Sequence, residues 1–209
     1  MSIEALVDND LVYKLARYDL LIEFERLLAL RSFAQPHGRI ATAPYALKLM
    51  KNPVVADWWL DARQADALRG FLLKRCRPVT GTRAAALTAL NVEALDPGEV
   101  TLVAYALEHE SALIFTGDKR ALRAIAQQPS LTGIAAALDR RFVHLSMVAR
   151  RLSKRLGWER VRAAVVKCEV DIDLYRLYLL PKAPLIETGL DGSIARLRSE
   201  TGTLLMTDF

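Results

Sequence analysis

Apolar positions recur with two different periods along the chain, and this alternation predicts alternating strands and helices. Short apolar runs of strand length occupy residues 3–7, 39–43, 112–116 and 141–145. After the first run, apolar residues recur every three or four positions up to Leu28, which predicts a helix. Strands separated by helices form the βαβ pattern of a parallel sheet. The sequence therefore predicts an α/β fold with a parallel sheet flanked by helices.

Further helical patterns follow in the middle of the chain, several of them opened by residues typical of a helix start. They cover roughly 45–51 after Pro44, then 57–76, 82–91, 100–110 and 119–128.

The last third of the chain predicts a separate unit. Residues 146–180 are helical in pattern, and their apolar stretch LYRLYLL is of a kind that packs in a core or in a homodimer. From Ile186 to Phe209 the periodicity is weak, so we expect an appendage that forms a strand or contacts a partner. The expected organisation is a domain over 1–145, followed by a helical C-terminal extension and tail over 146–209.

Composition points to a soluble cytoplasmic protein. No run of eighteen or more apolar residues is present, so no membrane span is expected. The N-terminus carries an acid early and lacks a basic region before an apolar stretch, which argues against a secretory signal. Cys76 and Cys168 lie far apart without a CxxC motif, as reduced thiols do.

Positive charge is concentrated in one segment. The chain has a net charge of +5, and residues 139–167 hold nine basic side chains against two acidic ones. Such a stripe is the electrostatic footprint expected for a phosphate backbone, so RNA is a candidate partner. The candidate contact residues are Arg150, Arg151, Lys154 and Arg155. The alternative is an ordinary solvated helix face, because Lys and Arg are common on helix surfaces.

Three acidic residues take related places in the predicted topology. Asp8 and Asp118 each follow a strand and open a helix, and Glu99 lies in the first turn of a helix that leads into a strand. The carboxyl ends of parallel strands share one edge of the sheet, where ligand sites form. Clustered carboxylates repel one another unless a cation joins them, and oxygen ligands suit Mg²⁺ or Mn²⁺. The sequence therefore predicts a metal site made by these acids.

At these residues the chain resembles the PIN-domain nuclease family. LVDNDLVYKLARYDLL is similar to that family's first strand and helix, and DPGEVTLVAYALEHESALIFTGDKRALRAIA is similar to a later block with Thr-x-Asp after an apolar strand. The resemblance covers about residues 4–145. It implies Asp8, Glu99 and Asp118 as catalytic metal ligands, with Thr116 as a supporting hydroxyl. It also implies RNA cleavage, often by a toxin paired with a small antitoxin.

One departure from the family pattern leaves two interpretations open. The family places another acid near residues 45–49, where this chain reads Tyr-Ala-Leu-Lys-Leu. Asp57 or Asp61 could substitute for it. The first interpretation is a metal-dependent ribonuclease. The second is a catalytically degenerate PIN-like module that binds RNA or protein, and a scaffold that uses the apolar C-terminal segment is a third.

Each acid also has a structural interpretation. Asp96-Pro97-Gly98-Glu99 resembles a capping box, with Asp96 as the N-cap and Glu99 three residues later. Asp8 or Asp10 could cap the first predicted helix, and Asp118 could cap its own. Asp96 and Asp10 are otherwise expected to support the metal site.

Other common sites lack their motifs. The three histidines, His37, His109 and His144, are isolated, so a zinc site is not expected. GxSxG, GxxxxGK[ST] and GxGxxG are absent, which excludes a nucleophile elbow and the usual nucleotide-binding loops.

Overall fold

The computed structural model describes residues 4–30, 40–42, 60–79, 93 and 95–209. Its centre is a five-stranded parallel sheet, with the strand order β3-β2-β1-β4-β5. The strands are β1 (Glu4–Val7), β2 (Ile40–Thr42), β3 (Cys76–Pro78), β4 (Ala112–Thr116) and β5 (Phe142–His144). The predicted α/β class, a parallel sheet flanked by helices, is confirmed.

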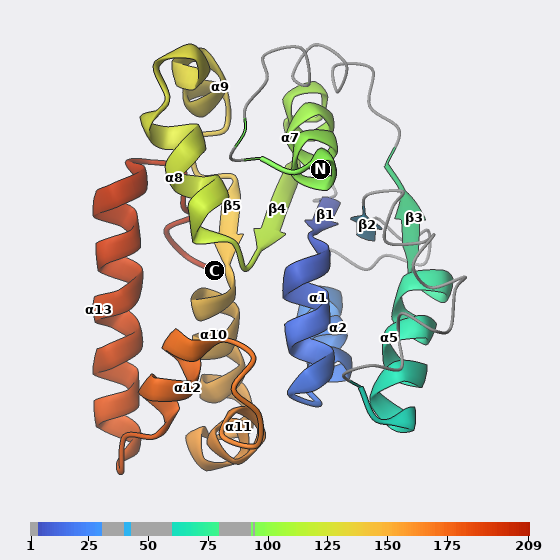
Figure 1. The fold of residues 1–209 in the computed structure, drawn as a ribbon, viewed down its shortest axis with the longest axis vertical. Coiled ribbons are helices and arrows are strands. Elements are labelled where there is room, and N and C mark those ends of the chain that lie inside the picture. Colours follow the sequence, from blue (N-terminus) through green and yellow to red (C-terminus); the bar gives the residue numbers. More distant parts are fainter. Residues whose placement is uncertain (1–3, 31–39, 43–59, 80–92, 94) are drawn as a thin grey trace.

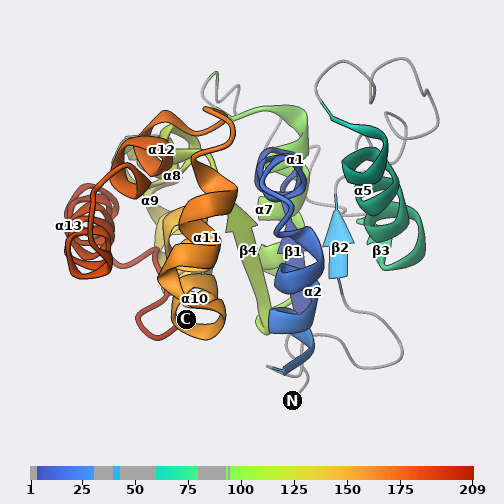
Figure 2. The ribbon, with the colours of Figure 1, turned by 90° about the horizontal axis from the view of Figure 1, so that it is seen from below.

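Helices account for most of the remaining described chain. They are α1 (Asn9–Arg17), α2 (Leu21–Leu30), α5 (Ala62–Lys74), α7 (Pro97–Glu108), α8 (Lys119–Gln127), the 3₁₀ turn η1 (Pro129–Leu131), α9 (Thr132–Ala137), α10 (Leu145–Leu156), α11 (Trp158–Val165), α12 (Ile172–Tyr178) and α13 (Ala183–Thr201). Figure 1 shows the strands crossing the molecule in order, with α5 beside β3 and the C-terminal helices beyond β5. Figure 2 shows the same separation of α5 and α13 to opposite sides.

The central strands are buried along their whole length. Every residue of β1 and β4 is buried, as expected for parallel strands covered on both faces. The register pairs Ala5 with Leu113 and Val7 with Phe115. Glu4 is the charged residue among them, at the amino end of β1, where the Tyr105 hydroxyl donates to it at 2.8 Å and Arg77 forms an ion pair with it.

The first predicted helix is two helices. α1 and α2 are separated at Tyr18-Asp19-Leu20, where Asp19 adopts a left-handed φ of 57°. The Asp19 carboxylate pairs with Arg63 of α5, and the Gln64 side chain donates to the Arg17 carbonyl. The apolar spacing continues through this break because both helices bury leucines in the same core, so periodicity alone could not reveal it.

The C-terminal tail is not the expected appendage. Residues 183–201 form α13, with Pro184 in the first turn, where proline is tolerated. Beyond α13, Leu205 makes a parallel bridge to Phe142, and the Phe209 ring packs edge-on against Phe115 of β4 at 5.3 Å. The end of the extension therefore covers the same sheet that the N-terminal part builds.

Two further expectations complete the comparison. The helices predicted at 45–51 and 82–91 lie outside the described residues. Among the described helices, none combines the length and apolar character needed to cross a membrane.

Candidate carboxylate site at the switch point of the sheet

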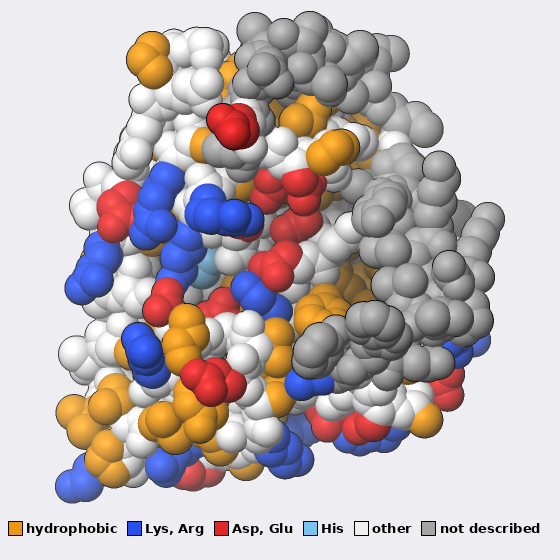
Figure 3. Space-filling view, in the orientation of Figure 1, with side chains coloured by type: hydrophobic (Ala, Val, Ile, Leu, Met, Phe, Trp, Pro, Cys, Tyr) orange, Lys and Arg blue, Asp and Glu red, His pale blue; other side chains and the backbone are white. Residues whose placement is uncertain are grey.

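The strand order creates a switch point between β1 and β4. β2 and β3 lie on one side of β1, and the chain then returns to add β4 and β5 on the other side. Ligands of open α/β sheets bind outside the carboxyl ends of the strands at such a point. Asp8 directly follows β1 and Asp118 lies two residues beyond β4. Figure 3 shows acidic side chains gathered near the centre of this face.

Asp8 is a buried carboxylate at this edge. It occupies the N-cap position of α1, but its side chain makes no capping hydrogen bond. It is 7 % exposed, and no cationic side chain pairs with it among the described residues. Burial, with the nearby charge of Asp10, raises the pKa of Asp8 to about 7, although the hydrogen bond from Thr116 acts in the opposite direction. The capping interpretation therefore fails for this side chain.

Thr116 connects the two strand ends. Its hydroxyl donates to Asp8 Oδ2 at 3.1 Å and accepts from the Asp118 backbone N–H at 3.0 Å. The backbone reinforces this link, because the Asp8 N–H donates to the Phe115 carbonyl at 2.9 Å. The hydroxyl of Thr116 thus orients one candidate ligand and the turn that carries another.

Glu99 fits both of its interpretations. The capping box is present: Asp96 Oδ1 accepts from the Glu99 N–H at 2.8 Å, and Glu99 Oε2 accepts from the Asp96 N–H at 2.9 Å. The side chain is nevertheless buried at the edge. Burial raises the pKa of Glu99 to about 8, with added repulsion from Asp96, Asp8 and Asp118. Glu99 is therefore a helix cap whose carboxyl group is also repelled by the charges of Asp8 and Asp118.

Asp8, Glu99 and Thr116 share a small cavity. Its volume is about 10 Å³, roughly the room of one water molecule. Its other lining side chains are apolar: Leu95, Leu102, Val103, Ile114, Ala121, Ile125 and Phe142. Ionising both carboxyl groups in these apolar surroundings has a high free-energy cost. The cavity therefore favours a proton or a cation between them.

Asp118 sits at the same edge but outside this cavity. It is the N-cap of α8, as its structural interpretation predicts, and accepts from the Arg120 and Ala121 backbone N–H groups. The exposed Arg120 guanidinium also binds it at 2.8 Å. Burial acts to raise the pKa of Asp118, but these hydrogen bonds outweigh it and the pKa is lowered. Asp118 is therefore the ionised member of the three.

The three acids fit a hard divalent cation in donor chemistry, since all their donors are carboxylate oxygens. The strongest structural sign of a cation site is the buried Asp8 carboxylate, which no described cationic side chain pairs with. Within the described ranges, however, no three His, Cys, Asp or Glu side chains stand close enough together to form a ready metal-ligand set. Glu99 is engaged in its cap and Asp118 with Arg120, so direct ligation by all three requires these contacts to give way.

Two further acids, Asp10 and Asp171, lie close to this edge although they are far apart in the sequence. Lys14 of α1 pairs with Asp10 at 2.8 Å and with Asp171, which precedes α12, at 3.0 Å. Asp10 also lies against Gly117, where an added Cβ would stand 2.4 Å from its Oδ2. Asp10 is thus a surface acid in an ion-pair chain, one that the C-terminal helices complete.

His144 was missed as a positioning residue. At the end of β5 it is 1 % exposed, its Nδ1 accepts from the Ser146 N–H at 3.1 Å, and its Nε2 lies 3.3 Å from the Gly117 carbonyl. The ring therefore caps α10 and holds the turn before Asp118. Burial lowers the pKa of His144 to about 4, so the ring is neutral. The only signal in the sequence was its place within the apolar run at residues 141–145.

The two candidate substitutes for the family's additional acid have separate outcomes. Residues 45–49 and Asp57 lie outside the described residues. Asp61 is the N-cap of α5, in a complete capping box with Gln64. The Asp61 carboxylate therefore accepts a hydrogen bond from the first turn of α5.

The predicted basic stripe on α10 is partly neutralised within the protein. Arg150 forms an ion pair with Asp191, and Lys154 pairs with Glu187 at 2.9 Å, both on α13. Arg151 and Arg155 are exposed. A role of this stripe in binding nucleic acid stays a prediction.

We expect Thr116→Val to destabilise the protein, because it removes a donor to the buried Asp8 carboxylate and the acceptor of the Asp118 N–H. The loss should be about 1–3 kcal/mol in urea unfolding at pH 7. Thr116→Ser is the matched control, since it keeps the hydroxyl, and it should lie close to the wild type. Equal stability of the valine and wild-type proteins would contradict the bridging role of Thr116.

No family model matches this chain, and the searches of curated proteins and of solved structures likewise found no significant match.

Proposed function

We propose that this protein is a metal-dependent ribonuclease, in which Asp8, Glu99 and Asp118 hold Mg²⁺ or Mn²⁺ and an RNA phosphodiester bond is cleaved. The observation that carries the proposal is Asp8, a buried carboxylate at the switch point whose side chain makes no capping hydrogen bond and pairs with no cationic side chain in the described part of the chain. The resemblance of the flanking segments to PIN-domain nucleases supports RNA as the substrate.

The free-energy cost of ionising the two buried acids supports a ligand-binding role for this site. A carboxylate whose pKa is raised to about 7 destabilises the folded protein at neutral pH when it ionises without a cation. Glu99, whose pKa is raised to about 8, adds to the same cost. Perturbed carboxyl groups in a cleft are characteristic of functional sites.

The side chains would divide the work as follows. A bound Mg²⁺ or Mn²⁺ would supply Lewis acidity and an activated water. Asp8 and Glu99 would bind it after losing their protons, and Asp118 would bind it without proton loss because it is already ionised. Thr116 would keep the Asp8 carboxylate oriented through its hydroxyl. The apolar wall of the cavity would exclude other water molecules from the two buried carboxylates.

A degenerate PIN-like binding module is the second candidate, and specific contacts favour it. Arg120 occupies Asp118, Glu99 is committed to its cap, and the described acids form no ready ligand set. In that case the fold would bind RNA without cleaving it. The two candidates differ in metal binding and in cleavage.

The test of the proposal is metal-induced stabilisation measured together with cleavage. Mg²⁺ or Mn²⁺ at a hundredfold excess over its Kd should stabilise the protein by about 2.7 kcal/mol. For a chain of this size that is a rise in Tm of roughly 5–10 °C. Asp118→Asn should remove most of the rise, and cleavage of single-stranded RNA should require the metal.

The matched control for this test is Asp66→Asn, an exposed acid on α5 that pairs with Arg69 of the same helix. It should keep the full metal-induced rise. A rise that persists in Asp118→Asn would place the metal elsewhere. RNA binding without cleavage in Mn²⁺ would favour the degenerate module.

A further inference from the structure

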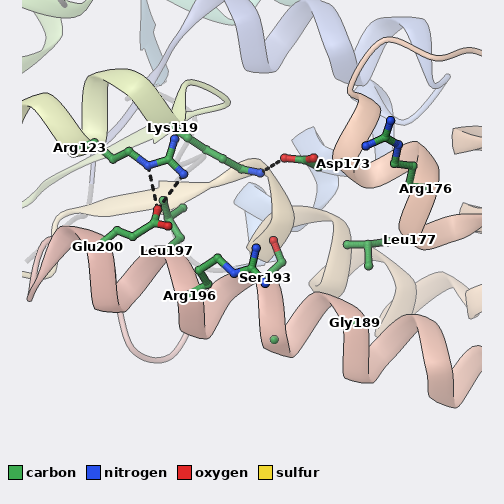
Figure 4. A pocket seen from close by; sticks show the side chains of 11 residues that line it. Lys119, Arg123, Asp173, Arg176, Leu177, Gly189, Ser193, Arg196, Leu197 and Glu200 are labelled. Carbon is green, nitrogen blue, oxygen red and sulfur yellow. Dashed lines mark hydrogen bonds and ion pairs between the residues drawn. The ribbon is translucent and has the colours of Figure 1, made fainter.

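A second hollow lies beside the carboxylate site, between α8, α12 and α13 (Figure 4). Its volume is about 390 Å³, within the range of pockets that hold small ligands or parts of larger ones. We call it the basic pocket, after its four cationic lining residues: Lys119, Arg123, Arg176 and Arg196. Asp173 and Glu200 are its two acids.

The cations outnumber the acids, and two of them are left over. Lys119 forms an ion pair with Asp173, and Arg123 binds Glu200 at 2.7 Å. Figure 4 shows these two pairs on the α8 side of the hollow. Arg176 of α12 and Arg196 of α13 are exposed, and no acidic side chain pairs with either among the described residues. The basic pocket therefore carries an excess positive charge that a bound anion would balance.

Two glycines of α13 shape the opposite wall of the basic pocket. Gly189 and Gly192 line the basic pocket from α13, and Ser193 adds a hydroxyl between them and Arg196. A Cβ added at Gly189 would stand 2.6 Å from Leu177, so this glycine lets α12 approach α13 closely. A Cβ added at Gly192 would meet nothing within 4 Å. Space at this wall and donors around it suit a group with several acceptor oxygens.

The basic pocket lies next to the carboxylate site along α8. Lys119 is the residue after Asp118, and Arg123 lies one turn further along α8, about 6 Å away along the helix axis. Figure 3 shows basic side chains beside the acidic centre on the same face of the molecule. A chain of phosphates that enters the carboxylate site has this pocket as its neighbour.

We propose that the basic pocket binds a backbone phosphate of the RNA strand, next to the phosphodiester held at the carboxylate site. This inference rests on the proposed function and names the surface that holds its substrate. Arg176 and Arg196 supply the uncompensated charge, whereas Arg150 and Lys154 of the α10 stripe are already paired with α13. The strand therefore runs over α8 and α13 rather than along α10.

The test is RNA binding in EDTA, where no metal-dependent cleavage can occur. Arg176→Ala/Arg196→Ala should weaken binding of a short single-stranded oligoribonucleotide roughly tenfold near 0.1 M salt, measured by fluorescence anisotropy. The slope of log K against log salt should fall in magnitude by about 0.7, because one phosphate contact on a single strand is lost. The control Lys74→Ala/Lys167→Ala removes two exposed cations elsewhere and should bind like the wild type.

A second pair of variants separates charge from folding. Gly192→Glu places a carboxylate in open space at the basic pocket, and Gly192→Gln adds a neutral side chain of the same size. Only the glutamate should weaken binding, while circular dichroism and Tm stay alike for the two. If both bind RNA like the wild type, the proposal is overturned.

Two further outcomes distinguish the alternatives. If Arg151→Ala/Arg155→Ala weakens binding and the pocket variant does not, the strand follows α10 and the proposal fails. It also fails if a nucleoside monophosphate fills the basic pocket without displacing the oligoribonucleotide. If the wild type binds RNA through Arg176 and Arg196 but does not cleave it in Mn²⁺, RNA binding at the basic pocket stands and the ribonuclease function is rejected.

Discussion

Asp8→Asn is expected to stabilise the protein in the absence of metal, and to abolish the cleavage of RNA that we propose for it. Asparagine has nearly the same shape and can still accept the hydrogen bond from Thr116. It lacks the charge that the apolar cavity disfavours. Activity should fall by more than roughly 100-fold, which is the upper range for loss of a residue that only supports a metal ligand.

The stability effect has a defined pH dependence. The ordinary pKa of an aspartate is 3.8, and burial raises that of Asp8 to about 7 in the folded protein. Between these values the folded state holds a proton that the unfolded state has lost, so stability falls as pH rises from about 4 to about 7. Above pH 7 Asp8→Asn should be more stable than the wild type by on the order of 2–4 kcal/mol.

Thermal unfolding in EDTA at pH 4, 6 and 8 would measure this effect. The variant should exceed the wild-type Tm by roughly 5–15 °C at pH 8 and approach it at pH 4. Glu4→Gln is the control on the same strand, because Glu4 is paired with Arg77 and Tyr105 at the opposite edge of the sheet. That change should lower the Tm. An Asp8→Asn protein that is less stable at pH 8 would contradict the cost assigned to Asp8.

His144 is expected to produce the opposite pH dependence. Its pKa is lowered from 6.5 to about 4 by burial, so the folded state resists a proton that the unfolded state accepts. Stability is fully present above pH 6.5 and is lost as pH falls towards 4, by roughly 3 kcal/mol. His144→Asn keeps an acceptor for the start of α10 but should lack this acid-side loss.

Comparison of Tm at pH 5 and pH 7 would test this expectation. At pH 7 His144→Asn should be less stable than the wild type, because the contact with the Gly117 carbonyl and part of the packing are lost. The difference should shrink at pH 5. A constant difference for His144→Asn would contradict a buried neutral imidazole.

Some elements could be predicted from the sequence because one local signal dominated each. The run ALIFT predicted both ends of β4, and the Asp-Pro-Gly-Glu sequence predicted a capping box at the start of α7. β3 was missed because it is short, lies at the edge of the sheet, and reads Cys-Arg-Pro without an apolar pattern. α13 was missed because glycines such as Gly189 and Gly192 interrupt its apolar pattern, which left the periodicity weak.

The candidate site, too, could be predicted from the sequence only in part. The positions of Asp8 and Asp118 after parallel strands could be predicted, because strand direction places both at one edge. The partners of these acids could not be predicted. Lys14 meets Asp171 across 157 positions of sequence, and no spacing rule connects them. Sequence also could not show that Asp8 lacks a capping bond whereas Asp118 has two, since both precede a helix.

The packing of residues 204–209 has a consequence for synthesis of the chain. Phe209 covers Phe115 in β4, and Leu205 extends the edge of the sheet beside Phe142. β1 and β4 themselves pair across more than a hundred residues. At 5–20 residues per second, a ribosome completes β4 on the order of ten seconds before it adds the residues that cover it. During this interval the Phe115 ring lacks its contact with Phe209, so the nascent chain exposes more apolar surface, and is more prone to aggregate, until residues 204–209 have emerged.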